Sequence, residues 1–495
     1  RKTRELGYSS EILQLDEVRS LLQRGKLPGC LVLSGGPWSV YEDNANYDFI
    51  FEKDIPILGI CYGMQLIGKY FGGTVKRGNI GEYGKIDIFL KDNFHIPHCP
   101  TKFSVWMSHS DHIGSIPSEF ISLMEGENGI LASIKHKTRP IIGLQFHPEV
   151  EHTQYGKDIL QFFYREMAGL TEDWDGGVML QEGLESFKAV NDPVLCAFSG
   201  GVDSLVSAVL AHRVLGNALK CFFVDNALTR PQDMVHIANL KKETSLDIEV
   251  IDAKELFLER LRLIKDPESK RKIIGQTFIE VFEQKVAEYQ NSHNIQFKYL
   301  LQGTLYPDVI ESRSPFSQKG RSVTIKSHHN VGGLPERMKL QLLEPLRWLF
   351  KDEVRKLGME LGLKEEWLWR HPFPGPGIGV RILGELTLDR IKKVQQSDQI
   401  LFEELKRQKF YHKTWQAFTV FLPVLTVGIK GDARAYENVN CIRMVNSSDG
   451  MTASWTKAPW ELLSKVSSRI TNEVREITRV VYDITDKPPG TIEWE

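Results

Sequence analysis

The residues Val194-Leu195-Cys196-Ala197-Phe198 are followed at once by Ser199-Gly200-Gly201-Val202-Asp203-Ser204 and then by a helix-forming pattern. A short apolar run bounded by glycines and succeeded by a helix is typical of a buried strand in a parallel α/β unit. The two glycines allow the backbone to curl around a phosphate group, and the amides that begin the helix supply hydrogen-bond donors. This segment therefore predicts a phosphate-binding loop at the end of a strand.

The residues alone leave a second interpretation of this loop open. A glycine-rich turn with a Ser/Asp helix cap would need no more than these residues, and the absence of Gly-x-x-x-x-Gly-Lys-Ser disfavours an ordinary P-loop NTPase. If phosphate binds, the serine hydroxyls add contacts and Asp203 helps to hold Mg²⁺. Lys351 either reaches the pyrophosphate or lies on a solvated helix face. The predicted ATP-binding residues are Ser199, Gly200, Gly201, Val202, Asp203, Ser204, Leu205 and, where the next strand ends, Val224.

Apolar runs alternate with helix-period stretches on both sides of this loop, which predicts two parallel-sheet α/β domains. The polar segment 169–177 separates the two blocks and reads as a linker. After the proline-rich segment 370–377 the pattern changes to strands mixed with amphipathic helices, which indicates a small α+β domain. We therefore expect three domains, at residues 1–170, 171–372 and 373–495.

A second candidate site lies in the first block. Cys61 stands in Gly59-Ile60-Cys61-Tyr62-Gly63, between a short apolar strand and a helical pattern. A nucleophile on such a sharp turn needs small neighbours, and the N-terminus of the following helix favours the thiolate. Downstream, His147 offers a base and Glu149 a carboxylate that could orient its imidazole. Taken singly, each of these residues is more often structural than catalytic.

Together with Ser34-Gly35-Gly36-Pro37, these motifs closely resemble the class I glutamine amidotransferases. In that family the cysteine attacks the glutamine carboxamide, ammonia leaves, and water resolves the thioester. The resemblance implies that Cys61, His147 and Glu149 are catalytic, and that Gly36 and Gln65, with the segment 107–111, border the glutamine pocket.

The phosphate loop resembles the signature of the N-type ATP pyrophosphatases, which split ATP between the α- and β-phosphates and adenylylate a carbonyl oxygen. Three further segments resemble the glutamine-hydrolysing GMP synthetase family: 270–275, 430–434 and the end Lys487-Pro488-Pro489-Gly490-Thr491-Ile492-Glu493-Trp494-Glu495. The resemblance covers essentially the whole chain and implies ATP-dependent amination of XMP through an adenylyl-XMP intermediate. The XMP-binding residues that it implies are Arg271, Asp432, Lys487, Ile492 and Glu493.

Composition and charge fit this class of enzyme. The chain has 41% hydrophobic and 25% charged residues and a net charge of −2, which gives no electrostatic case for a nucleic-acid or membrane partner. Six cysteines without disulfide or metal spacing favour the cytoplasm. The expected ligands are XMP, glutamine, ATP and Mg²⁺, and the expected assembly is a homodimer.

Two alternative functions and three structural expectations complete the prediction. The chain could be another glutamine-dependent pyrophosphatase such as an NAD synthetase, or a non-catalytic regulatory relative. Relative to the family, about twenty residues that hold the first strand are expected to be missing. Ala227 stands where a glycine is expected. The tail 487–495 is expected to serve acceptor binding and not folding, because its prolines stiffen it.

Overall fold

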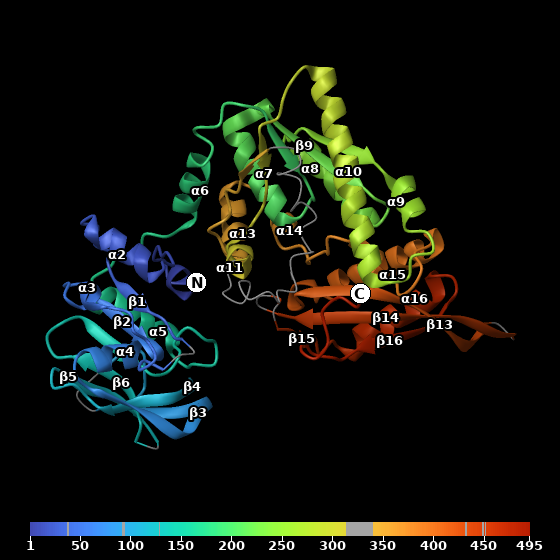
Figure 1. Cartoon of the computed structure of the whole chain (residues 1–495). Coiled ribbons are helices and arrows are strands. Elements are labelled where there is room, and N and C mark those ends of the chain that lie inside the picture. The colour runs from blue at the N-terminus through green and yellow to red at the C-terminus, as the bar shows by residue number, and fades with distance from the viewer. Residues whose placement is uncertain are drawn as a thin grey trace. The chain divides into compact units, whose positions relative to one another are not determined.

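The computed structural model describes residues 1–36, 39–91, 95–127, 129–312, 340–430, 433–447, 450 and 452–495 (Figure 1). Internal contacts divide the chain into two compact units, Arg1–Asp175 and Gly176–Glu495. Within the described residues, no helix is both long and apolar enough to cross a membrane.

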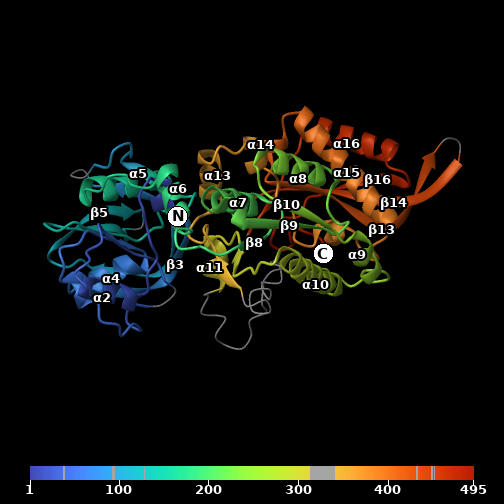
Figure 2. The same cartoon turned by 90° about the horizontal axis from the view of Figure 1, so that it is seen from above.

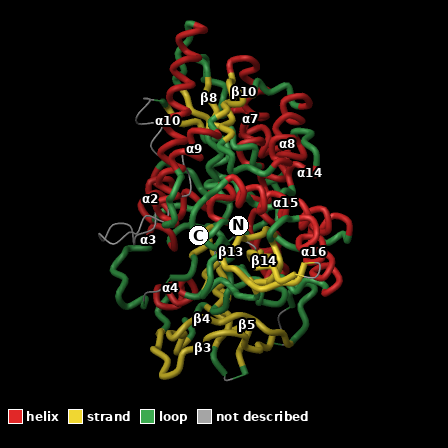
Figure 3. Tube along the Cα trace, turned by 90° about the vertical axis from the view of Figure 1, so that its right-hand side faces the viewer, coloured by secondary structure: helices red, strands yellow, loops and turns green. Residues whose placement is uncertain are grey.

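The first unit is built on a seven-stranded sheet in the order β1-β2-β7-β6-β5-β3-β4. Its first three strands are parallel, and the remaining pairs are antiparallel. Both β2 and β7 are short, apolar and buried along their whole length, as strands covered on two faces must be. Figure 3 shows β3, β4 and β5 of this sheet together in yellow. The strands are β1 (Leu31–Leu33), β2 (Ile57–Ile60), β3 (Thr74–Leu90), β4 (Lys102–Ser115), β5 (Phe120–Gly126), β6 (Leu131–His136) and β7 (Ile141–Leu144).

Helices cover this sheet and connect its parallel strands. The helix that matters most for function is α4 (Tyr62–Tyr70), which begins directly after β2 and packs on β2 and β7. The others are α1 (Lys2–Glu5), α2 (Leu15–Gln23), α3 (Asp48–Phe51), α5 (Gly156–Gln161) and the π-helix η1 (Phe162–Met167).

The second unit begins with a five-stranded parallel sheet in the order β10-β9-β8-β11-β12. The strand order reverses at β8, so the carboxyl end of β8 is the position where α/β sheets bind ligands. Figure 2 shows this sheet from above with α7 and α10 beside it. The strands are β8 (Val194–Ala197), β9 (Leu219–Asp225), β10 (Ile248–Asp252), β11 (Tyr299–Leu301) and β12 (Gln341–Leu343). The helices are α6 (Gly176–Glu185), α7 (Val202–Leu215), η2 (Gly216–Ala218), α8 (Pro231–Glu243), α9 (Lys254–Arg260), α10 (Pro267–His293), α11 (Tyr306–Ser312), α13 (Lys351–Glu360) and α14 (Glu365–Leu368).

A second sheet of four strands follows in the same unit. The strand β14 pairs antiparallel with β13 and β15 and parallel with β16, and α15 and α16 pack beside it. The elements are η4 (Gly377–Arg381), α15 (Leu388–Arg407), η5 (Tyr411–Lys413), β13 (Gln416–Lys430), β14 (Ala433–Asn446), β15 (Ser454–Trp455), α16 (Trp460–Glu473) and β16 (Ile477–Asp483).

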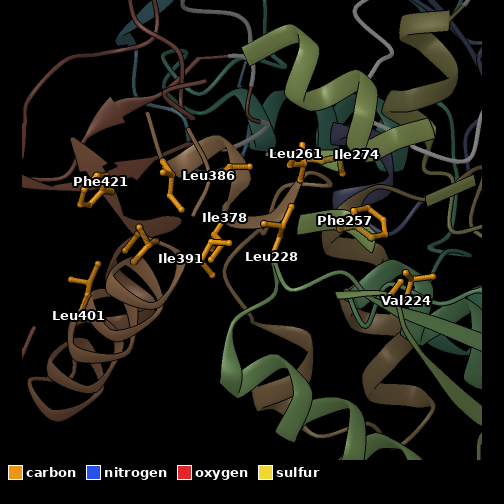
Figure 4. Close-up of a cluster of buried hydrophobic side chains, with 14 of the residues drawn as sticks. Val224, Leu228, Phe257, Leu261, Ile274, Ile378, Leu386, Ile391, Leu401 and Phe421 are labelled. Carbon is orange, nitrogen blue, oxygen red and sulfur yellow. The ribbon is translucent and has the colours of Figure 1, made fainter. Parts of the chain in front are cut away.

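One hydrophobic core joins the two sheets of the second unit (Figure 4). It runs from Val224 in β9 and Leu228 just after that strand, through Ile378 in η4, to Ile391 in α15 and Phe421 in β13. The predicted mixed α/β fold class is confirmed. The predicted division at residues 372 and 373 falls inside this unit, between its two sheets, and stays a prediction.

Candidate active sites

Cys61 lies on a strained elbow between β2 and α4. Its φ of 52° and ψ of −104° are rare for a residue with a side chain, and such strain concentrates at functional sites. A Cβ on Gly63 would lie 2.1 Å from Leu33 O, and one on Gly59 would lie 2.6 Å from the backbone of Gly63. Only glycine fits at both positions, so the spacing Gly-x-Cys-x-Gly is a steric requirement of the elbow.

The thiol of Cys61 is enclosed but meets polar groups. Its residue is 6% exposed, and Sγ lies 3.8 Å from Ser108 O and 3.8 Å from Gln145 Nε2. A Cβ on Gly35 would lie 3.7 Å from Cys61 Cβ and 3.1 Å from His147 Cε1. The glycine loop, the thiol and the imidazole therefore face a common point.

His147 is held for proton transfer. Its Nδ1 donates to Glu149 Oε1 at 2.7 Å, and hydrogen bonding to the Cys61 side chain and then to Glu149 raises the pKa of His147 to about 10. Thr153 Oγ1 donates to His147 O at 2.6 Å and accepts from Trp106 N at 3.0 Å, which fastens this loop to β4. The arrangement keeps a nucleophile, a base and an orienting carboxylate together.

The two residues predicted for the glutamine pocket lie next to this elbow. Gln65 is buried in α4, and its Nε2 donates to Asp111 O at 2.7 Å, which ties the helix to β4. A Cβ on Gly36 would lie 3.6 Å from the ring of Tyr62. The Tyr62 hydroxyl in turn donates to Asp43 at 2.5 Å, and this hydrogen bond holds the ring that faces Gly36 in place.

The predicted phosphate loop follows β8 and opens α7. Ser199 Oγ lies 2.9 Å from Ser204 Oγ and accepts from Gly201 N at 3.3 Å, so the two serines close the loop upon itself. Gly200 has a φ of 71°, in the left-handed region where glycine is favoured. A Cβ on Gly303 would lie 2.9 Å from the backbone of Asp203. Because these glycines carry no side chain, a phosphate group could approach the backbone of the loop closely.

Asp203 is paired with Lys351, the cation whose role the sequence left open. The ammonium of Lys351 lies 2.7 Å from each carboxylate oxygen of Asp203, and the two side chains are 42% and 30% exposed. The pair is therefore accessible to a polyanionic ligand. The described residues hold no group of three or more acidic, histidine or cysteine side chains placed to bind a metal.

Three other predicted ATP-binding residues contribute no exposed side chain. Val202, Leu205 and Val224 are all buried, and Leu205 N already donates to Gly201 O at 2.9 Å. Any contact of these residues with a nucleotide would come from the main chain.

The predicted acceptor residues that the structure describes lie in α10 and in the tail. Lys487 Nζ donates to Gly450 O at 2.8 Å, and its main chain bridges to Ala453. Glu493 accepts from Arg381 at 2.9 and 3.1 Å and from Gln416 at 2.8 Å. A hollow of about 300 Å³ beside Lys487 is lined by Asn446, Ser447, Thr452, Ala453, Ser454, Asp486 and Pro488.

Ile492 packs against the buried cluster of Phe418, Val420 and Cys441, and Arg271 Nη2 donates to the main-chain oxygen of Glu495. Asp432 lies outside the described residues. Fully buried Lys270 and Arg381 pair with the tail carboxylates of Glu495 and Glu493. These contacts speak against the expectation that the tail does not serve folding, which stays a prediction.

Comparisons with known proteins agree on one family. The models for "Glutamine amidotransferase class-I" and "GMP synthase C terminal domain" match residues 1–167 and 403–494. Proteins named GMP synthase [glutamine-hydrolyzing] from Thermosipho africanus and Chlorobium chlorochromatii are 47% and 48% identical, and one from a Nitratiruptor species is 50% identical. Each alignment spans 100% of this chain and 96% of the relative. This chain belongs to the glutamine-hydrolysing GMP synthase family. The family prediction is confirmed, and the NAD synthetase alternative is not favoured.

Sequence reasoning missed a charged cluster beneath the phosphate loop of this GMP synthase family member. Arg370 Nη1 donates to Gly200 O at 3.4 Å, and its Nη2 pairs with Asp233. Asp233 also accepts from Arg230 at 3.0 and 3.1 Å. Two cations thus share one carboxylate next to the loop. The sequence pointed to this cluster only through the position of Arg370 at the start of the proline-rich segment 370–377.

Proposed function

We propose that this chain makes GMP by two linked reactions, in which glutamine is hydrolysed to glutamate and ammonia, and ATP activates XMP for amination. It is a ligase of the glutamine amidotransferase type. The observation that carries the proposal is the presence of an assembled Cys61–His147–Glu149 arrangement in the same chain as a phosphate loop at a topological switch point. A regulatory relative without activity would have no need to keep both.

In the glutaminase reaction, Cys61 Sγ attacks the carboxamide carbon of glutamine and forms a γ-glutamyl thioester. His147 delivers a proton to the departing ammonia, and the carboxylate of Glu149 holds its ring in place. The amides at the start of α4 are the donors available to the tetrahedral oxyanion. Water then attacks the thioester, with His147 as base, and releases glutamate and the thiol.

In the synthetase reaction, the C2 oxygen of XMP attacks the α-phosphorus of ATP, and pyrophosphate leaves. Ammonia then attacks C2 of the adenylyl-XMP, and AMP leaves. The loop from Ser199 to Ser204 and the ammonium of Lys351 are suited to bind the phosphates. Closing the site around the activated acceptor would exclude the water that otherwise hydrolyses it.

Mg²⁺ fits this site in a limited way. The ion is usually held by one or two carboxylates together with substrate phosphates and water, and Asp203 supplies one accessible carboxylate. When bound, the ion would neutralise phosphate charge. Asp203 would have to turn from Lys351 toward the ion, which leaves the ammonium to the phosphates.

The acceptor site is proposed at Arg271, Asp432, Lys487, Ile492 and Glu493. Arg271 and Lys487 offer cations for the 5′-phosphate of XMP, and Glu493 offers acceptors for its polar base. The hollow beside Lys487 supports this assignment.

The assembly is proposed as a homodimer in the cytoplasm. The hairpin of β13 and β14 carries exposed apolar side chains at alternate positions: Leu425 is 65%, Val427 50% and Ile429 81% exposed, and Tyr436 opposite Val427 is 65% exposed. An apolar face of this kind is suited to contact a second copy. Analytical ultracentrifugation tests it: Ile429→Glu should give monomers, and a monomeric wild-type chain would overturn the dimer. All six cysteines are free thiols, which supports a reducing compartment.

The decisive experiment for the function measures AMP release with ATP, glutamine and one acceptor at a time. XMP should support turnover, whereas IMP, deamido-NAD and aspartate should not. Activity with one of the other acceptors and none with XMP would refute the proposed reaction.

A further inference from the structure

Glu495 is bound by segments that lie far apart in the sequence. Its side chain, which is 6% exposed, accepts from Lys270 Nζ and, at 3.2 Å, from Gly384 N. Its main-chain oxygen accepts from Arg271 Nη2. Figures 1 and 2 both show the end of the chain beside α10, which carries Lys270 and Arg271. The residue therefore links α10, the segment after η4 and the tail.

The carboxylate of Glu495 satisfies a buried charge. Lys270 is fully buried, and its other acceptor is Ile382 O at 2.6 Å, a neutral group. A buried ammonium group is tolerated when it is paired with an opposite charge and hydrogen-bonded. Lys270 and Gly384 thus fix the side chain of Glu495, and through it the position of its main chain.

Arg271 follows Lys270 in α10, and the position of the Glu495 main chain affects how its guanidinium is held. Its side chain is 15% exposed, and the carboxylate of Glu268 lies 3.9 Å from its Nε on a side chain that is 82% exposed. So distant and solvated a partner holds a guanidinium group weakly. Of these two contacts, the one with the Glu495 main chain is shorter and better enclosed, so it constrains the direction of the guanidinium more strongly than Glu268 does.

We propose that Glu495 is a positioning residue for the acceptor. Anchored on Lys270 and Gly384, it holds its main-chain oxygen against Arg271 and so aims the guanidinium at the phosphate of the acceptor nucleotide. The inference rests on the proposed assignment of Arg271 to XMP. Glu495 itself touches Arg271 and not the reacting atoms.

Steady-state kinetics of the full chain test this, with ammonium chloride as nitrogen donor and XMP varied at saturating ATP. In Glu495→Gln the KM for XMP should rise about ten- to a hundredfold, the range for losing a charge-assisted contact, while kcat falls much less. Glu268→Gln, the matched control on the same arginine, should leave KM unchanged. If Arg271→Ala also leaves KM unchanged, the acceptor assignment itself fails. If Arg271→Ala raises KM and Glu495→Gln does not, the acceptor assignment stands and the positioning role is refuted.

A second variant separates positioning from simple neutralisation of Lys270. Lys270→Met/Glu495→Gln removes the buried charge together with its partner, so its thermal melt should lie above that of Glu495→Gln. Its KM for XMP should nevertheless stay raised, because the anchor is still lost. Recovery of KM along with the melting temperature would overturn the proposal and reduce Glu495 to a counter-ion.

Discussion

The pair between Asp203 and Lys351 allows stability and catalysis to be separated by one substitution, Lys351→Met. Both side chains are substantially exposed, at 30% and 42%, although their atoms lie 2.7 Å apart. Exposed ion pairs contribute about 0.2–1 kcal/mol to folding. We therefore expect the free energy of unfolding to change by less than about 1 kcal/mol.

The effect on turnover should be much larger, because the same ammonium would stabilise charge that develops on the phosphates. Losing one such preorganised group typically lowers the rate by about 10²–10³. The assay is AMP release from ATP and XMP with ammonium chloride, which bypasses the glutaminase. Lys364→Met is the control, since Lys364 forms an ion pair of similar exposure with Glu243, at 51% and 36%. Wild-type turnover in Lys351→Met would refute the assignment of this pair to ATP.

Three other predictions follow from the contacts. Cys61→Ala should abolish glutamine-dependent synthesis and keep synthesis from ammonium chloride; loss of both in a folded protein would contradict separate sites. The pKa of His147 is raised to about 10 by Cys61 and then Glu149, so the imidazolium is present below that pH and is lost as the pH rises through it. Glu149→Gln should shift the alkaline limb of the glutaminase pH–rate profile to lower pH, and an unshifted limb would show that Glu149 does not set this pKa. Deleting residues 487–495 strands the buried charge of Lys270 and should destabilise the second unit by about 3–5 kcal/mol; an unchanged thermal melt would refute this.

The sequence could predict those parts of the two sites whose residue types are required by steric contacts with near neighbours in the chain. The elbow at Cys61 needs Gly59 and Gly63 because neither position admits a Cβ. Ala227 has a φ of 64°, in the region that favours glycine, which is the residue that the family resemblance led us to expect there. Strand, glycine loop and helix are adjacent in the chain, so β8 and α7 were also readable from the sequence.

The long-range ion pairs could not be predicted from the sequence, because no local pattern indicates which distant residues will meet. Lys351 and Asp203 are 148 residues apart in sequence, and Lys270 and Glu495 are 225 apart. A lysine in the first turn of a helix looks the same whether its partner is water or a distant carboxylate. Burial of Lys270 is likewise set by the packing of α10 against other segments and not by its neighbours in the chain.

Deleting the tail cannot separate its role in folding from its proposed role in binding XMP, because the same side chains would serve both. Arg381 is fully buried and takes its bidentate partner from Glu493. A carboxylate already committed to a buried cation stays fixed in direction, which suits it to accept hydrogen bonds from a bound base at low entropic cost. The same commitment means that removing it leaves Arg381 to Asp398, 3.4 Å away, alone. Any tail variant that loses XMP binding must therefore be judged against its melting temperature. A substitution that removes the partner of a buried cation needs a companion variant that restores the charge balance, as Lys270→Met does for Glu495→Gln.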